Sequence, residues 1–98
     1  MWRHGDVLIA RCDEVPADSK KLPHLILARG ERTGHAHRIE QREGNELFEL
    51  GEDLFLRITR QPATVVHEEH GPISLEPGTY RVWIQREYSP EAIRRVLD

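Results

Sequence analysis

The apolar residues of this chain fall in short stretches divided by turn-forming residues, and this pattern constrains the fold more than any other feature. Runs of roughly four to eight residues bounded by glycine, proline and polar residues are typical of β-strands. The sequence therefore predicts an all-β fold, with strands over residues 7–10, 25–28, 33–40, 47–50, 54–59, 63–67, 73–75 and 79–88.

The last of these segments alternates between two faces, because Tyr80, Val82 and Ile84 recur with the period of two that a strand requires. We expect these three side chains to face the core. After this strand, Ser89 followed by proline favours the start of a helix, since serine caps a helix N-terminus and proline fits its first position. We therefore expect a short C-terminal helix at about residues 90–97.

About seven short strands and one terminal helix can bury their apolar faces as a small antiparallel barrel or sandwich. The chain has 98 residues, the length of one domain, so we expect a single unit over residues 1–98. Exposed sheet edges in such a unit would favour a homodimer that covers them.

Charge and hydropathy exclude several classes of partner. The chain carries 14 basic and 17 acidic residues, so it lacks the basic footprint of proteins that bind duplex DNA. No apolar run approaches the roughly 18 residues that span a bilayer, and the first residues lack the apolar segment of a secretory signal. The single cysteine, Cys12, excludes an internal disulfide. We therefore expect a cytoplasmic protein that does not bind membranes.

The histidines carry the strongest chemical signal. Four of the six fall in two close pairs, and the first pair is His35 and His37. Residues i and i+2 of a strand point to the same side, so this pair shares a face with Ile39. Ile39 is the large aliphatic residue of the segment, and we expect its face to be the inward one. Two imidazoles would then point toward the interior.

The second pair is His67 and His70. By the same parity, His67 follows Val65 on one face of its strand, and a turn at Gly71 would let His70 approach the same point. Imidazoles that converge in this way suit a divalent transition metal. The sequence predicts one metal ion bound by His35, His37, His67 and His70. We expect zinc, or manganese or iron if carboxylates also bind the ion.

Three function classes stay open from the residues alone. A metal-dependent enzyme would act on a small-molecule or phosphoester substrate, with Glu68 or Glu69 as general base. A metal-independent enzyme would cleave RNA or another phosphodiester through paired histidines, with Arg38 or Arg32 holding the phosphate. A non-enzymatic adaptor would use the histidine face to contact a partner. In all three, we interpret His4 and His24 as polar surface residues.

Several segments resemble a group of small, uncharacterised bacterial proteins. They are T-G-H-A-H-R-I at 33–39, H-E-E-H-G-P-I at 67–73, P-G-T-Y at 77–80 and Q-R-E-Y at 85–88. The resemblance covers nearly the whole chain and implies no particular activity.

The chain also loosely resembles the cupins, small β-barrels whose metal is held by an H-x-H pair, a glutamate and a later histidine. This resemblance implies that His35 and His37 match the first pair and that Glu40 or Glu43 stands for the glutamate. The later histidine would be His67 or His70. The proline-glycine turn precedes the last histidine in cupins, whereas it follows the histidines here.

Overall fold

The computed structural model describes residues 1–30 and 34–85. These residues form ten strands and no helix. The helix expected at about residues 90–97 lies outside the described residues. The strands are β1 (Trp2–His4), β2 (Val7–Arg11), β3 (Lys20–Lys21), β4 (Ile26–Arg29), β5 (Ala36–Ile39), β6 (Asn45–Leu50), β7 (Asp53–Ile58), β8 (Ala63–Val66), β9 (Ile73–Leu75) and β10 (Gly78–Ile84).

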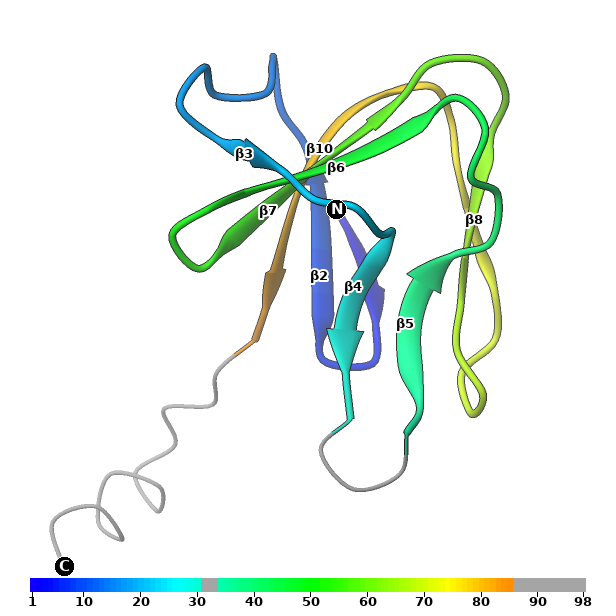
Figure 1. The fold of residues 1–98 in the computed structure, drawn as a ribbon. Helices are drawn as coiled ribbons and strands as arrows, with labels where there is room; N and C mark the ends of the chain where they lie inside the picture. The colour runs from blue at the N-terminus through cyan, green and yellow to red at the C-terminus, as the bar shows by residue number, and fades with distance from the viewer. Residues whose placement is uncertain (31–33, 86–98) are drawn as a thin grey trace, which may run out of the picture.

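The strands form two separate antiparallel sheets (Figure 1). One has six strands in the order β1-β2-β10-β7-β6-β3, and the other has four in the order β4-β5-β8-β9. The all-β prediction is confirmed, but the closed barrel is wrong, since no ladder joins the sheets within the described residues. Three of the four connections between the sheets contain a proline, namely Pro23, Pro62 and Pro77. Proline lacks the N–H that would continue a ladder, so the chain leaves one sheet there.

The hydrophobic core draws its side chains from both sheets. Strands with one buried face alternate as expected: Val7 and Ile9 are buried on β2, and Tyr80 and Val82 on β10. Ile84 departs from the predicted pattern, because it is 52% exposed at the end of β10, where it lines a pocket. The buried cluster comprises Val7, Ile9, Leu27, Ile39, Leu47, Leu56, Ile58, Ala63, Val65, Leu75, Tyr80 and Val82.

Two strands went unpredicted, β1 and β3. The first forms a hairpin with β2 in which His4 pairs with Val7 across a two-residue loop, and Gly5 in that loop has a φ of 63°. A positive φ favours glycine, so the loop matches a tight hairpin turn. The hairpin brings the N-terminal residues to the edge of the six-stranded sheet. No helix in the described part of the chain is long and apolar enough to cross a membrane.

Candidate metal centre

Two strands of the four-stranded sheet place one histidine each beside the core. Ile39 of β5 pairs with Val65 of β8, and both are buried. His37 lies two residues before Ile39, and His67 lies two residues after Val65. In an antiparallel pair, these steps lead to facing positions on the same side of the sheet. The two imidazole rings accordingly lie 4.2 Å apart between centroids.

His70 joins them from the turn between β8 and β9. Its ring centroid lies 4.7 Å from that of His67 and 5.5 Å from that of His37. The three histidines each offer a nitrogen, and these atoms lie within 4.8 Å of one another. Gly5 permits this approach, because a Cβ there would stand 2.8 Å from His70 Nε2 and 2.9 Å from His37 Cε1.

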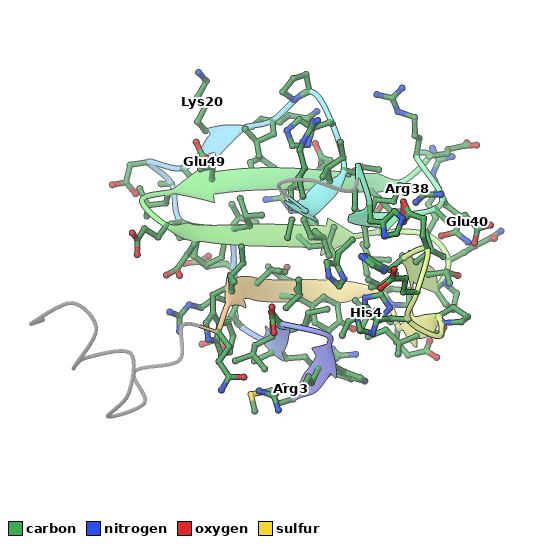
Figure 2. All side chains as sticks on the ribbon, turned by 90° about the horizontal axis from the view of Figure 1, so that it is seen from below. Arg3, His4, Lys20, Arg38, Glu40 and Glu49 are labelled. Carbon is green, nitrogen blue, oxygen red and sulfur yellow. The ribbon has the colours of Figure 1, made fainter. Side chains whose placement is uncertain are left out.

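His4 completes the cluster, although we expected it on the surface. That interpretation is wrong: His4 is 3% exposed and lies on the side of β1 opposite to Arg3 (Figure 2). Its Nδ1 lies 2.8 Å from His37 Nδ1, and its Nε2 lies 2.9 Å from the Gly71 carbonyl oxygen. The signal that would have placed it is the Gly5-Asp6 loop, a two-residue hairpin pattern.

His24 is half-buried outside the cluster, and its Nδ1 accepts a hydrogen bond from the Ile26 N–H.

His35 lies beside the cluster and is not part of the three-nitrogen group. Its ring centroid lies 5.6 Å from that of His67, and its Nδ1 lies 3.4 Å from a carboxylate oxygen of Glu69. Of the four histidines predicted as ligands, the structure thus brings three together and sets the fourth at their edge.

The two predicted general bases occupy different surroundings. Glu69 lines the pocket beside the histidines. Glu68 instead accepts a hydrogen bond from the Ala36 N–H and faces Arg38, with 3.9 Å between Arg38 Nη1 and the carboxylate. Desolvation opposes the shift, but hydrogen bonds from the backbone N–H groups of Glu68 and Ala36 lower the pKa of the Glu68 carboxyl. Glu68 and Arg38 therefore form a pair on the outer side of β5.

The glutamates that the cupin resemblance implies as ligands lie away from the cluster. Arg38 and Glu40 alternate with the inward residues of β5 and are exposed (Figure 2). Glu43 is also exposed and pairs with Arg60. Neither carboxylate belongs to the three-nitrogen group.

Burial keeps the inner imidazoles neutral. Desolvation lowers the pKa of His37 to about 4, the neighbouring His67, His4 and His70 add to the shift, and Asp6 opposes it. Desolvation also lowers the pKa of His4, although the hydrogen bond to Gly71 opposes that change. Metal ligation requires neutral imidazoles, so this environment favours the form that binds metal.

An open pocket of about 330 Å³ gives solvent access to the cluster. His35, His37, His67 and His70 line it together with Glu69. Its remaining wall is formed by the β1–β2 loop, the end of β4 and the end of β10, with residues Gly5, Asp6, Val7, Ala28, Arg29, Gly30 and Ile84. A small solute can therefore reach the nitrogens from outside.

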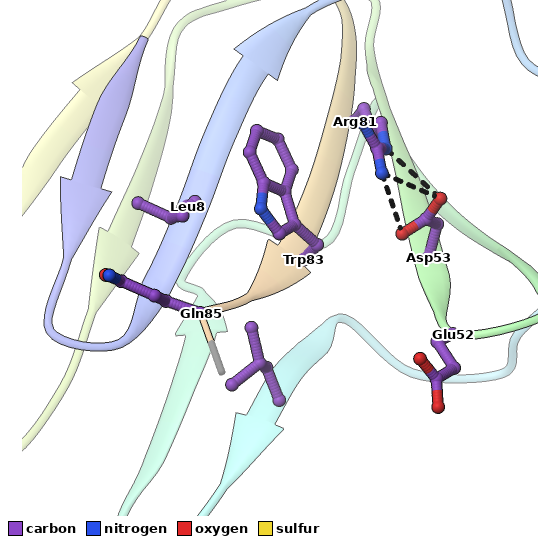
Figure 3. A pocket seen from close by; sticks show the side chains of 7 residues that line it. Leu8, Glu52, Asp53, Arg81, Trp83 and Gln85 are labelled. Atoms are coloured by element: carbon purple, nitrogen blue, oxygen red, sulfur yellow. Dashed lines mark hydrogen bonds and ion pairs between the residues drawn. The ribbon is translucent and has the colours of Figure 1, made fainter. Parts of the chain in front are cut away.

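A second pocket of about 380 Å³ lies on the outer face of the six-stranded sheet (Figure 3). Its charged groups are already engaged, because Arg81 forms two hydrogen bonds with Asp53, at 3.1 and 3.3 Å. The Arg81 guanidinium also lies 4.7 Å from the centre of the Trp83 ring. Such a paired network is typical of a solvated sheet surface.

Comparison with known proteins identifies a family. The chain matches a family described as a domain of unknown function (DUF8820) over residues 3–85, which includes all the histidines of the cluster. No curated protein and no solved structure is significantly similar to the chain.

Proposed function

The chain belongs to the DUF8820 family, whose function is unknown, and we propose that it binds one divalent transition metal ion through His37, His67 and His70. One observation carries the proposal: three imidazole nitrogens from β5 and from the segment after β8 lie within 4.8 Å of one another beside an open pocket. His35 stands beside this set as a neighbour of Glu69.

The donor set suits a metal ion in its chemistry, and its nitrogens are spaced somewhat more widely than around a bound ion. Imidazole nitrogens are ligands of zinc and of other late transition metals. Around a tetrahedral zinc ion, histidine nitrogens lie about 3.3 Å apart, which follows from the usual zinc–nitrogen distance. The three nitrogens lie within 4.8 Å of one another, so the rings would have to rotate inward on binding, and His67 Nδ1 accepts a hydrogen bond from the Glu69 N–H. Zinc is therefore the metal we expect, and manganese or iron would need a carboxylate, for which Glu69 is the nearest candidate.

Three protein ligands leave a coordination position open, which is the arrangement of catalytic zinc sites. A metal there would supply Lewis acidity toward a small molecule or a phosphoester. Glu69 lines the pocket and is therefore our candidate for the general base, whereas the carboxylate of Glu68 accepts a hydrogen bond from the Ala36 N–H at the start of β5. Arg29 lines the same pocket and offers a cation for an anionic substrate.

Metal content tests the binding proposal. We expect close to one equivalent of zinc in tag-free protein purified without chelator, measured by inductively coupled plasma mass spectrometry. Alanine at His37, His67 or His70 should lower this stoichiometry, and His24→Ala serves as the matched control because His24 lies outside the cluster. Metal content near zero in wild-type protein, or equal in all four variants, would refute the site.

Hydrolysis of bis(p-nitrophenyl) phosphate and p-nitrophenyl acetate tests the enzymatic part. We expect EDTA to abolish turnover and zinc to restore it, and we expect Glu69→Gln to lower turnover more than Glu68→Gln. RNA cleavage that survives EDTA would instead favour the metal-independent phosphodiester enzyme. A protein without metal and without cleavage, purified with a stable partner, would favour the adaptor.

A further inference from the structure

We propose that His4 is a positioning residue that fixes the tautomer of His37, so that His37 presents the lone pair of its Nε2 atom to the metal ion. The inference rests on the proposed metal site and adds a residue that does not itself touch the metal. Two observations carry it: the contact between the two Nδ1 atoms at 2.8 Å, and the contact of His4 Nε2 with the Gly71 carbonyl at 2.9 Å.

The direction of both hydrogen bonds follows from the Gly71 carbonyl. A carbonyl oxygen only accepts, so His4 Nε2 must carry the proton in that bond. In a neutral imidazole the other nitrogen then has a lone pair and no proton, so His4 Nδ1 accepts. The proton between the rings must come from His37 Nδ1. Neutral His37 is therefore left with its lone pair on Nε2.

The surroundings of the ring are consistent with this assignment. His37 Nδ1 is engaged by His4, and His37 also belongs to the group whose nitrogens lie within 4.8 Å of one another. If Nδ1 donates to His4, Nε2 is the nitrogen of His37 that remains for a metal ion.

His4 also ties two ligand-bearing segments together. Gly71 directly follows His70, so the bond from His4 Nε2 holds the turn that carries this histidine. The bond through Nδ1 holds His37 on β5. His4 itself lies on β1, which pairs with β2, and its side chain is buried. Outer partners of this kind orient a ligating histidine and raise its affinity for metal.

Two variants separate the hydrogen bonds from the bulk of the side chain. His4→Leu keeps a similar volume and removes both bonds. His4→Gln keeps one acceptor and one donor, which an amide carries at a spacing close to that of the two ring nitrogens. His24→Leu is the control for removing a histidine outside the cluster. Circular dichroism and thermal unfolding establish that each variant is folded.

The first readout needs no metal. Long-range ¹H–¹⁵N correlation spectra of EDTA-treated protein at pH 7.5 report which ring nitrogen of His37 is protonated. We expect the Nδ1–H tautomer in wild type and in His4→Gln, and a mixture or the other tautomer in His4→Leu. An Nε2–H tautomer in wild-type protein would overturn the inference, even if His4→Leu failed to fold.

The second readout is metal affinity, measured by competition with a zinc-binding dye. We expect His4→Leu to bind zinc about 10–100-fold more weakly, as is usual for loss of an outer partner, and His4→Gln to stay near wild type. Equal affinity in wild type and His4→Leu would overturn the inference while leaving the proposed metal site intact. Absence of zinc binding in wild type would refute the metal site. The tautomer measurement would then still decide whether His4 fixes the tautomer of His37.

The third readout separates positioning from ligation. Co(II) substituted for zinc absorbs visible light with an intensity that depends on coordination number. We expect the spectrum of Co(II)-saturated His4→Leu to match wild type, because His4 is not a ligand. A changed coordination number would show that His4 binds the metal directly and would overturn the positioning role.

Discussion

The same faces of the same strands carry two very different regions. On β5 and β8, Ile39 and Val65 face each other inside the core and are almost fully buried. Two residues away on each segment, His37 and His67 lie close together beside an open pocket. The β5–β8 ladder ends at the pair Arg38 and Val66, so the change from aliphatic to imidazole side chains coincides with the end of the ladder.

This difference shows how a small fold can hold a cluster of imidazoles without a large loss of stability. The aliphatic residues determine the register, and the histidines inherit their mutual position from it. Because the pocket admits solvent on one side, the imidazoles are only partly desolvated. In addition, every buried side-chain polar atom of the described residues has a hydrogen-bond partner. Ile39 and Val65 form an aliphatic row that we expect to determine stability, and His37 and His67 form an imidazole row that belongs to the proposed metal site. Substitutions can separate the two.

The largest expected effect comes from the aliphatic row. Ile39→Ala removes a side chain that is 4% exposed, so we expect the free energy of unfolding to fall by about 2–5 kcal/mol. Urea unfolding followed by tryptophan fluorescence measures this loss. A change below about 1 kcal/mol would show that Ile39 does not determine the stability of this face.

The next effect concerns the imidazole row. His67→Ala removes one of the three proposed ligands, so we expect zinc affinity to fall by more than the roughly 100-fold that loss of an outer partner causes. The metal-free variant should lose only about 1 kcal/mol or less of stability, because the side chain is half-buried. Zinc titration and urea unfolding of the same preparation check both parts. A larger stability loss than that of Ile39→Ala would break the division between the rows.

Gly5→Ala tests the packing around the histidines from a residue that belongs to neither row. The new Cβ would stand 2.8 Å from His70 Nε2, and the residue would have to keep a φ of 63°. We expect a loss of about 1 kcal/mol or more in stability, together with weaker zinc binding, because the rings must move apart. Gly51→Ala is the matched control: Gly51 has a similar φ of 62°, and a Cβ there meets nothing within 4 Å. Equal zinc affinity in both variants would contradict the steric role of Gly5.

The last prediction concerns the effect of pH on the metal-free protein, which changes neither row by substitution. His37 has a pKa of about 4 in the folded chain, against an ordinary value of 6.5 when unfolded. Between these values the unfolded chain binds more protons, so the free energy of unfolding should fall as pH decreases from 6.5 to 4. The lowered pKa of His4 acts in the same direction. His37→Ala should flatten the dependence in urea titrations, and an unchanged slope would contradict the assignment.

The sequence predicts the imidazole row as far as strand parity reaches. His37 could be placed from Ile39, and His67 from Val65, because a period of two links each histidine to an aliphatic residue. Strand parity does not determine how a turn folds, so it could not fix the position of His70, which lies in the turn after β8. His35 lies at the edge of the cluster because its position precedes the start of β5.

The parts that went unpredicted depend on long-range pairing. The strand β1 has three residues, too few for a visible alternation, and its place is set by pairing with β2 across the Gly5-Asp6 loop. His4 therefore reaches the cluster through a contact between residues 67 positions apart. The closed barrel failed for a related reason: alternation predicts strands and faces, but it does not say which edges pair.

The order of strands in the six-stranded sheet has a consequence for the time at which the cluster forms during synthesis. The β1–β2 hairpin is made first, yet its neighbour in the sheet is β10, the last strand described. Until β10 has left the ribosome, the hairpin has no ladder to join and His4 has no fixed place. His37, His67 and His70 are already synthesised by then. The complete cluster thus assembles only after the whole sheet is available, so a nascent chain would expose its incomplete histidine set before it acquires the buried arrangement.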